Sequence, residues 1–109
     1  MIKAERGDIW LVKLDPTIGS EINKTRPAII ISRTDYNLMA DTVTIIPISS
    51  KRFLPSFHVK IASMKQDSHA VIPQIRVAGK PRLVKKIGRT DLRELEQIDL
   101  KLKFYLDFL

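Results

Sequence analysis

Short apolar runs separated by polar turns make up most of this chain. Residues 9–14, 28–31 and 42–48 are rich in isoleucine, valine and threonine, which favour strands, and the 28–31 run predicts a strand buried on both faces. Residues 58–61 alternate polar and apolar side chains, as a strand with one buried face does. The pattern therefore predicts a sheet of short strands.

Three further segments are predicted to form short strands or a helical turn. Residues 70–77 predict a fifth strand, in which Pro73 indicates an edge position or a bulge. Residues 86–89 predict a short sixth strand, and residues 34–39 predict a helical turn between the second and third strands. Trp10, inside the first apolar run, is expected in the core rather than on a stacking surface.

Near the C-terminus the period changes from that of a strand to that of a helix. Leucine or isoleucine recurs at spacings of three and four, at Leu92, Leu95, Ile98, Leu102, Leu106 and Leu109. Thr90 is a good N-cap residue, and Asp91 and Glu94 favour the positively polarised start of a helix. We expect this amphipathic helix to cover the open side of the sheet.

Strands followed by one terminal helix predict an α+β fold, a small and strongly curved antiparallel sheet or partly open β-barrel. A length of 109 residues suffices for one core, so we expect a single domain over residues 1–109. No apolar run approaches the roughly 20 residues that span a bilayer. The N-terminal segment leads into a strand and not into a secretory signal, so we expect a cytoplasmic protein with no membrane partner.

Positive charge is concentrated late in the chain. The formal net charge is +7, and residues 76–93 contain seven arginines or lysines against Asp91 alone. Such a one-sided segment favours a polyanion or an acidic protein as partner, with a solubilising surface as the alternative.

A polar, charged insert at residues 19–27 lies between two apolar runs, where a rigid scaffold can hold functional side chains. Pro27 pushes the residue before it toward extended geometry, so Arg26 is expected at the mouth of the following strand. Its guanidinium matches phosphate in shape and stays protonated. Arg26 can therefore stabilise developing negative charge, whereas it is a poor general base.

Other polar residues could complete a phosphodiester site. Ser49 and Ser50, at the end of the third strand, offer hydroxyl donors, although Ser49 to Arg52 also reads as an ordinary polar loop. Gln74 and Arg76, two apart on the predicted fifth strand, would share one face and could contact a base and a phosphate of single-stranded RNA. A solvated strand face is the alternative.

Metal and cofactor sites are not predicted. The histidines, His58 and His69, lie on different segments without a ligand motif around them, and the chain has no cysteine. None of its four glycines has the spacing of a phosphate-binding loop.

Several short motifs, taken in order, closely resemble the MazF/PemK (Kid) family of toxin endoribonucleases. They are residues 7–10 (Gly-Asp-Ile-Trp), 14–17 (Leu-Asp-Pro-Thr), 19–21 (Gly-Ser-Glu), 26–28 (Arg-Pro-Ala), 48–49 (Ile-Ser) and 74–76 (Gln-Ile-Arg). The resemblance implies an SH3-like barrel of the CcdB/PemK type that forms a homodimer. It also implies a type II toxin that cleaves single-stranded RNA without metal and is neutralised by an acidic MazE-type antitoxin, a second candidate partner for the basic segment.

The same resemblance assigns residues. The family's catalytic arginine falls on Arg26, and its catalytic threonine falls on Ser49, which keeps the hydroxyl but lacks the methyl that stiffens χ1. Glu21 and Gln74 match substrate positions, and Arg76 matches a motif residue; Ser50 and Lys51 complete the expected substrate contacts. The implied reaction is attack of the ribose 2′-OH on phosphorus, which leaves a 2′,3′-cyclic phosphate.

Two other functions are compatible with such a chain. A CcdB-type toxin poisons gyrase through protein contacts and ends in Trp-Gly-Ile, whereas this chain ends in Asp-Phe-Leu. An RNA-binding module would use the basic surface without cleaving the RNA.

Overall fold

The computed structural model describes residues 2–16, 18–22 and 24–108, and in these it contains seven strands, two α-helices and two 3₁₀ turns. The strands are β1 (Asp8–Lys13), β2 (Thr25–Ile30), β3 (Thr42–Ser49), β4 (His58–Lys60), β5 (His69–Val71), β6 (Arg76–Gly79) and β7 (Leu83–Arg89). The helices are α1 (Thr34–Met39) and α2 (Leu92–Tyr105), and the 3₁₀ turns are η1 (Ile72–Gln74) and η2 (Lys80–Arg82).

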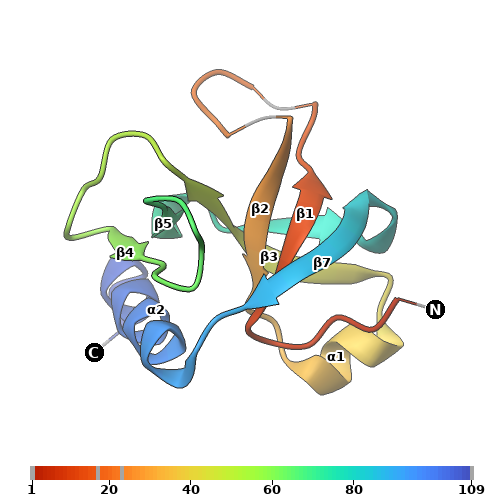
Figure 1. Cartoon of the computed structure of the whole chain (residues 1–109). Helices are drawn as coiled ribbons and strands as arrows, with labels where there is room; N and C mark the ends of the chain where they lie inside the picture. The colour runs from red at the N-terminus through yellow and green to blue at the C-terminus, as the bar shows by residue number, and fades with distance from the viewer. Residues whose placement is uncertain (1, 17, 23, 109) are drawn as a thin grey trace.

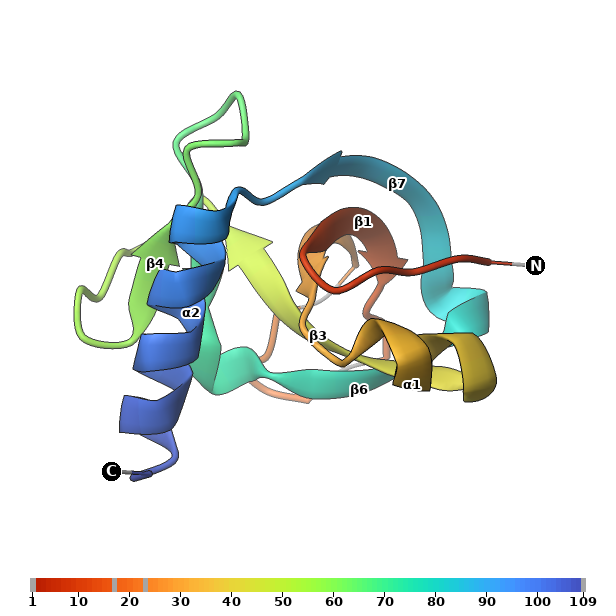
Figure 2. The same cartoon turned by 90° about the horizontal axis from the view of Figure 1, so that it is seen from below.

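All strand pairs are antiparallel, in the order β4-β5-β3-β2-β1-β7, with β6 on β3 beside β5 (Figure 1). Seen from below, β7 curves over β1 and the sheet bends strongly (Figure 2). The predicted α+β fold, a curved antiparallel sheet with a C-terminal helix, is confirmed. The barrel is not closed, because within the described residues the end strands β4 and β7 do not pair with each other.

β3 pairs with three other strands, β2, β5 and β6. Its residues 45–47 pair with β2 along one edge. Along the other edge, residues 42–45 pair with β6 and residues 48–49 pair with β5. One strand therefore joins two parts of the sheet and carries its last residue, Ser49, to their junction.

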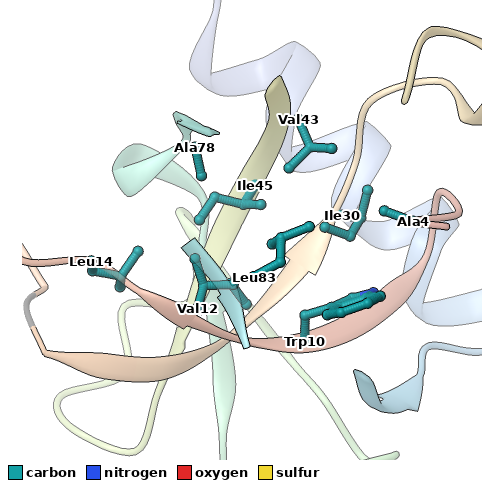
Figure 3. Packing of buried hydrophobic residues seen from close by; sticks show 10 residues of the cluster. Ala4, Trp10, Val12, Leu14, Ile30, Val43, Ile45, Ala78 and Leu83 are labelled. Carbon is teal, nitrogen blue, oxygen red and sulfur yellow. The ribbon is translucent and has the colours of Figure 1, made fainter. Parts of the chain in front are cut away.

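The central strands are buried on both faces. Trp10, Val12 and Leu14 of the first run pack with Ile30 and Ile45 in one cluster (Figure 3). The alternate residues Ile9, Ile29 and Ile46 pack with Ile98 of α2 in a second cluster. This explains why the sequence shows continuous apolar runs instead of alternation. The core position predicted for Trp10, and the strand buried on both faces at residues 28–31, are confirmed.

The predicted fifth strand over residues 70–77 is wrong as one continuous element. Pro73 lies in η1, which separates β5 from β6, because proline fixes φ and has no N–H for a ladder. β5 pairs with the end of β3, and β6 pairs with its beginning. Gln74 and Arg76 are therefore not on one strand as predicted, since Gln74 is in η1 and Arg76 opens β6, although both side chains reach the insert after β1.

Two other boundaries differ from the prediction. The sixth strand is longer than residues 86–89, because β7 begins at Leu83. β2 begins at Thr25, so Arg26 lies within the strand and not before it, opposite Val12 of β1. The extended geometry that Pro27 imposes on Arg26 is also the geometry of a strand.

The helix α2 is capped one residue later than predicted. Asp91 is the N-cap and accepts from the Glu94 backbone N–H at 2.7 Å, while Glu94 accepts from the Asp91 N–H at 2.9 Å. Thr90 is not the cap, because its buried hydroxyl donates to the Gly7 carbonyl. In the described residues, no helix is long and apolar enough to cross a membrane.

Only the middle of the apolar face of α2 is buried against the rest of the protein. Ile98 is fully buried, and Leu102 packs partly against the second cluster. The helix contacts β4 and η1, and Figure 1 shows it beside β4. Leu92 and Leu106 are 79% and 44% exposed. Leu109, the last position of the predicted stripe, lies outside the described residues.

Asp8 is a buried carboxylate that joins β1 to β7. It accepts from the Glu5 backbone N–H at 2.9 Å and from Arg89 at 2.7 Å, and Lys86 lies 3.2 Å away. Burial alone would raise the pKa of Asp8, but the hydrogen bonds from Glu5, Lys86, Trp10 and Arg89 together hold it below its usual value. The carboxylate is therefore ionised in the folded protein.

We expect Asp8→Asn to lower the free energy of unfolding at pH 7 by about 2 kcal/mol, because the buried donors lose a charged acceptor. Since the folded-state pKa of Asp8 is lowered, its contribution is complete above the ordinary value of 3.8 and is lost as the pH falls through the folded value. Urea unfolding of parent and variant should therefore converge at acid pH. The exposed Asp41→Asn is the control, and a constant gap between parent and Asp8→Asn would contradict the assignment.

Candidate active site

A groove of about 470 Å³ opens where β2 and β3 meet the insert that follows β1. Four stretches of chain form its walls: the insert, the start of β2, the end of β3 with its following turn, and the segment before β5. The lining residues are Gly19, Ser20, Glu21, Ile22, Arg26, Pro27, Ile48, Ser49, Ser50, Lys51, Met64, Gln66 and Ser68.

Arg26 and Ser49 both line this groove, from neighbouring strands. The β2–β3 ladder ends at Ala28 and Pro47, so Arg26 and Ser49 each lie two residues beyond that last pair, where the two strands leave each other. Arg26 pairs there with Val12 of β1, and Ser49 pairs with His69 of β5. Arg26 is exposed and Ser49 half-buried, so both side chains can reach a ligand in the groove.

The Ser49 hydroxyl is held by the turn that follows it. Its Oγ accepts from the Lys51 backbone N–H at 3.1 Å. Because the oxygen is an acceptor in this bond, the hydroxyl hydrogen is free to donate elsewhere. This bond restricts the side chain, which is the role that the methyl group of a threonine would otherwise fill. Ser50 and Lys51 are exposed on the same turn and line the groove.

The insert is tied together at its neck and at its tip. The Leu14 N–H donates to the Lys24 carbonyl, and the Lys24 N–H donates to Asp15 Oδ1, both at 2.9 Å. At the tip, Glu21 Oε1 accepts from the Ile18 N–H at 2.8 Å. Glu21 thus shapes the wall with one oxygen while it lines the groove. Thr17 and Asn23, which belong to the motif and to the insert, lie outside the described residues.

Gln74 and Arg76 support this wall from behind. Gln74 Oε1 accepts from the Ile22 N–H at 3.2 Å, and Arg76 Nη1 donates to the Leu14 carbonyl at 3.1 Å. Neither is a lining residue of the groove. The structure therefore brings Glu21, Arg26, Ser49, Ser50 and Lys51 together in the groove and places Gln74 and Arg76 behind the insert.

The wall formed by Met64, Gln66 and Ser68 was not predicted from the sequence. One residue beyond the pair Ser49 and His69, the register of β3 and β5 puts Ser68 opposite Ser50. Glu94 of α2 holds the start of this segment, since it accepts from both the backbone N–H and the hydroxyl of Ser63. Residues 62–68 have no periodicity, so knowledge of the strand pairing would be needed to find this wall.

Much of the basic segment 76–93 is engaged within the protein. Arg76 and Arg82 donate to backbone carbonyls around the base of the insert. Lys86 and Arg89 neutralise the buried Asp8. The groove carries its own charges, Arg26 and Lys51 against Glu21. In residues 2–16, 18–22 and 24–108, no three histidine, aspartate or glutamate side chains gather as a metal site would require.

A family model described as "PemK-like, MazF-like toxin of type II toxin-antitoxin system" matches residues 5–106. The chain belongs to this family. It is 37% identical to endoribonuclease MazF9 of Mycobacterium tuberculosis, over 94% of this chain and 95% of that protein. It is 31% identical to endoribonuclease EndoA of Bacillus subtilis, over 94% and 93% of the two chains.

Solved structures share the fold of this PemK/MazF-like chain. The crystal structure of MazF from Deinococcus radiodurans aligns with a TM-score of 0.88 at 19% identity, over 98% of this chain and 99% of that one. A mycobacterial endoribonuclease in complex with its cognate antitoxin aligns with a TM-score of 0.82 at 17% identity, over 96% of each chain. The partly open sheet with its terminal helix is therefore the fold of MazF structures.

We expect Gln74→Ala to loosen the insert, because the Ile22 N–H loses its acceptor. Amide hydrogen exchange at Ile22 should accelerate roughly fivefold, equivalent to about 1 kcal/mol for one hydrogen bond. Gln74→Glu keeps an acceptor oxygen and should exchange like the parent. Unchanged exchange in Gln74→Ala would show that this bond does not hold the wall.

Proposed function

We propose that this PemK/MazF-like toxin is an endoribonuclease that cleaves single-stranded RNA at short sequences without a metal. The observation that carries the proposal is that Arg26 and Ser49 line one groove, together with Glu21, Ser50 and Lys51. The relatives in Mycobacterium tuberculosis and Bacillus subtilis are both named endoribonucleases, which supports the same activity.

The reaction that the family resemblance implies is compatible with the groups that line the groove. The ribose 2′-hydroxyl gives up its proton and its oxygen forms a bond to the adjacent phosphorus as the bond from phosphorus to the 5′-oxygen breaks. The 5′-oxygen takes up a proton, so the reaction moves one proton overall from the 2′-oxygen to the 5′-oxygen. The nucleophile belongs to the substrate, so no metal-bound water is needed. Arg26 and the Ser49 hydroxyl donate hydrogen bonds to the phosphoryl oxygens, where negative charge develops. The products are a 2′,3′-cyclic phosphate and a 5′-hydroxyl.

The remaining lining residues bind the RNA around the scissile bond. Lys51 and Ser50 offer donors to neighbouring phosphates, and the free oxygen of Glu21 can accept from a base amino group. Gln74 and Arg76 contribute by fixing the wall that carries Glu21.

The proposed setting is a cytoplasmic toxin–antitoxin pair. The protein would act as a homodimer and be neutralised by an acidic antitoxin of the MazE type. Structures of MazE–MazF from Deinococcus radiodurans have this fold, with a TM-score of 0.83 for one crystal form over 100% of both chains. Surface lysines and arginines with no role in the Asp8 network are the natural partners for such an acidic segment.

Arg26→Ala should lower RNA cleavage on the order of 10²–10³-fold, because the transition-state charge loses its main donor. The assay uses a long RNA in EDTA, with detection of cyclic-phosphate ends and mapping of the cut sites. Arg33→Ala, which removes an exposed arginine at the start of α1, is the matched control and should cut like the parent.

Three results would overturn parts of this proposal. Full cleavage by Arg26→Ala would show that the site is assigned wrongly. Salt-dependent RNA binding by the parent without any cyclic-phosphate product would indicate a binding module. Inhibition of gyrase without RNA cleavage would indicate a poison of the CcdB type.

Ser49 provides a graded test of the second donor. Ser49→Ala should lower the cleavage rate by about tenfold to a hundredfold through loss of one hydrogen bond to developing charge. Ser49→Thr keeps the hydroxyl and should cut at least as fast as the parent. Single-turnover rates on one oligonucleotide measure both, and equal rates for the parent and Ser49→Ala would remove Ser49 from the mechanism.

A further inference from the structure

Two histidines form a stacked pair directly beside the active groove. The rings of His58 and His69 lie 4.8 Å apart between centroids with an angle of 14° between their planes. They are diagonal neighbours on one face of the β4–β5 hairpin, where His58 pairs with Val71 and Lys60 pairs with His69. Both are buried, with 7% and 5% of their surface exposed.

His69 is also the strand partner of Ser49. The two residues form the last pair of the β3–β5 ladder, which is only two residues long. Phe53, in the segment after Ser49, packs its ring edge-on against both histidines, at 5.4 Å from His69 and 6.1 Å from His58. The stack therefore fixes both the strand opposite Ser49 and the segment that leaves it.

Each ring is arranged to be neutral. His58 Nδ1 accepts from the Leu54 N–H at 3.2 Å, so a proton on that nitrogen would break the bond. His69 Nε2 is buried and has no hydrogen-bond partner among the described residues, so a proton there would be unsatisfied. A charge on both rings would place two like charges in contact.

Some groups around the two histidines lower their pKa values, and others raise them. Burial lowers the pKa of each histidine, and the neighbouring His69 lowers that of His58 further. For His69, a backbone hydrogen bond with Arg52 and the charge of Asp67 raise the pKa, whereas Lys60, which lies over the Phe53 ring, lowers it. The net direction is downward for both, so the pair is neutral at pH 7 and takes up protons only below the ordinary value of 6.5.

We propose that His69, stacked on His58, is a positioning residue for Ser49, and that protonation of this pair in acid releases the end of β3 and switches off RNA cleavage. The proposal rests on the endoribonuclease function proposed above and adds a proton-dependent control to it. Because Ser49 is the group that moves, the rate of the chemical step falls, whereas Arg26 and Lys51 continue to bind the RNA.

The first test follows the pair by NMR without any RNA. As the pH is lowered, the Ser49 backbone amide signal should shift with the same midpoint as the histidine ring signals, and that midpoint should lie below 6.5. A Ser49 signal that does not follow the histidine titration would overturn the proposal, whether or not the protein cleaves RNA.

The second test compares pH profiles of single-turnover cleavage and of RNA affinity. In the parent the cleavage rate should fall below the histidine midpoint and level off at about the tenfold to hundredfold loss expected for Ser49→Ala, with affinity nearly unchanged. The double variant His58→Asn with His69→Phe keeps an acceptor for Leu54 and an aromatic ring on β5, but it cannot titrate. It should lose this acid decline, and a decline equal to that of the parent would overturn the proposal.

Val71→Ala is the matched structural control, since it removes buried volume from β5 and leaves both histidines in place. It should retain the acid decline of the parent, and its loss in this variant would assign the effect to strand stability instead of the rings. If the parent cleaves no RNA at any pH, the proposed function fails, and the NMR titration alone decides the role of the histidine pair.

Discussion

The eight residues of β3 are hydrogen-bonded along both edges, to β2 on one side and to β6 and β5 on the other. A strand held in this way cannot slide, because a shift of one residue would exchange the side chains that face the two apolar clusters. The position of its last residue, Ser49, therefore depends on the pairing of β3 along both edges. The position of Arg26 depends on its pairing with Val12 of β1. The two residues proposed to act on RNA are therefore each held by a strand ladder, Arg26 by β1 and Ser49 by β5.

Ionic and polar contacts stabilise the margins of this sheet. Asp8 draws Lys86 and Arg89 of β7 onto β1, and Arg6 connects the N-terminal segment to Asp99 of α2. These contacts use cations that an inspection of charge alone would assign to a binding surface. The net charge of a small domain is therefore a poor guide to where it binds a polyanion, unless the internal partners of each cation are known.

The strands and the terminal helix could be predicted from the sequence, because apolar residues recur at different spacings in a strand and in a helix. Both kinds of element contribute apolar side chains to the core. The break at Pro73 and the cap at Asp91 were missed because longer-range contacts decided them: β3 has two partners on one edge, and the Thr90 hydroxyl is taken by Gly7. The motifs marked Arg26, Ser49 and Glu21, but only the register brings the first two together. The wall at Met64, Gln66 and Ser68 has no sequence pattern of its own and could not be predicted.

The insert that forms one wall of the groove is fastened at its neck by Leu14, Asp15 and Lys24, and from behind by Gln74 and Arg76. These anchors use mainly backbone atoms of the insert, so the exposed side chains at its tip carry little of the stability of the fold. Substitutions at the exposed Ile18 or Ser20 can therefore accumulate at low cost to folding. The shape of this wall can therefore change while the strand ladders that hold Arg26 and Ser49 stay the same.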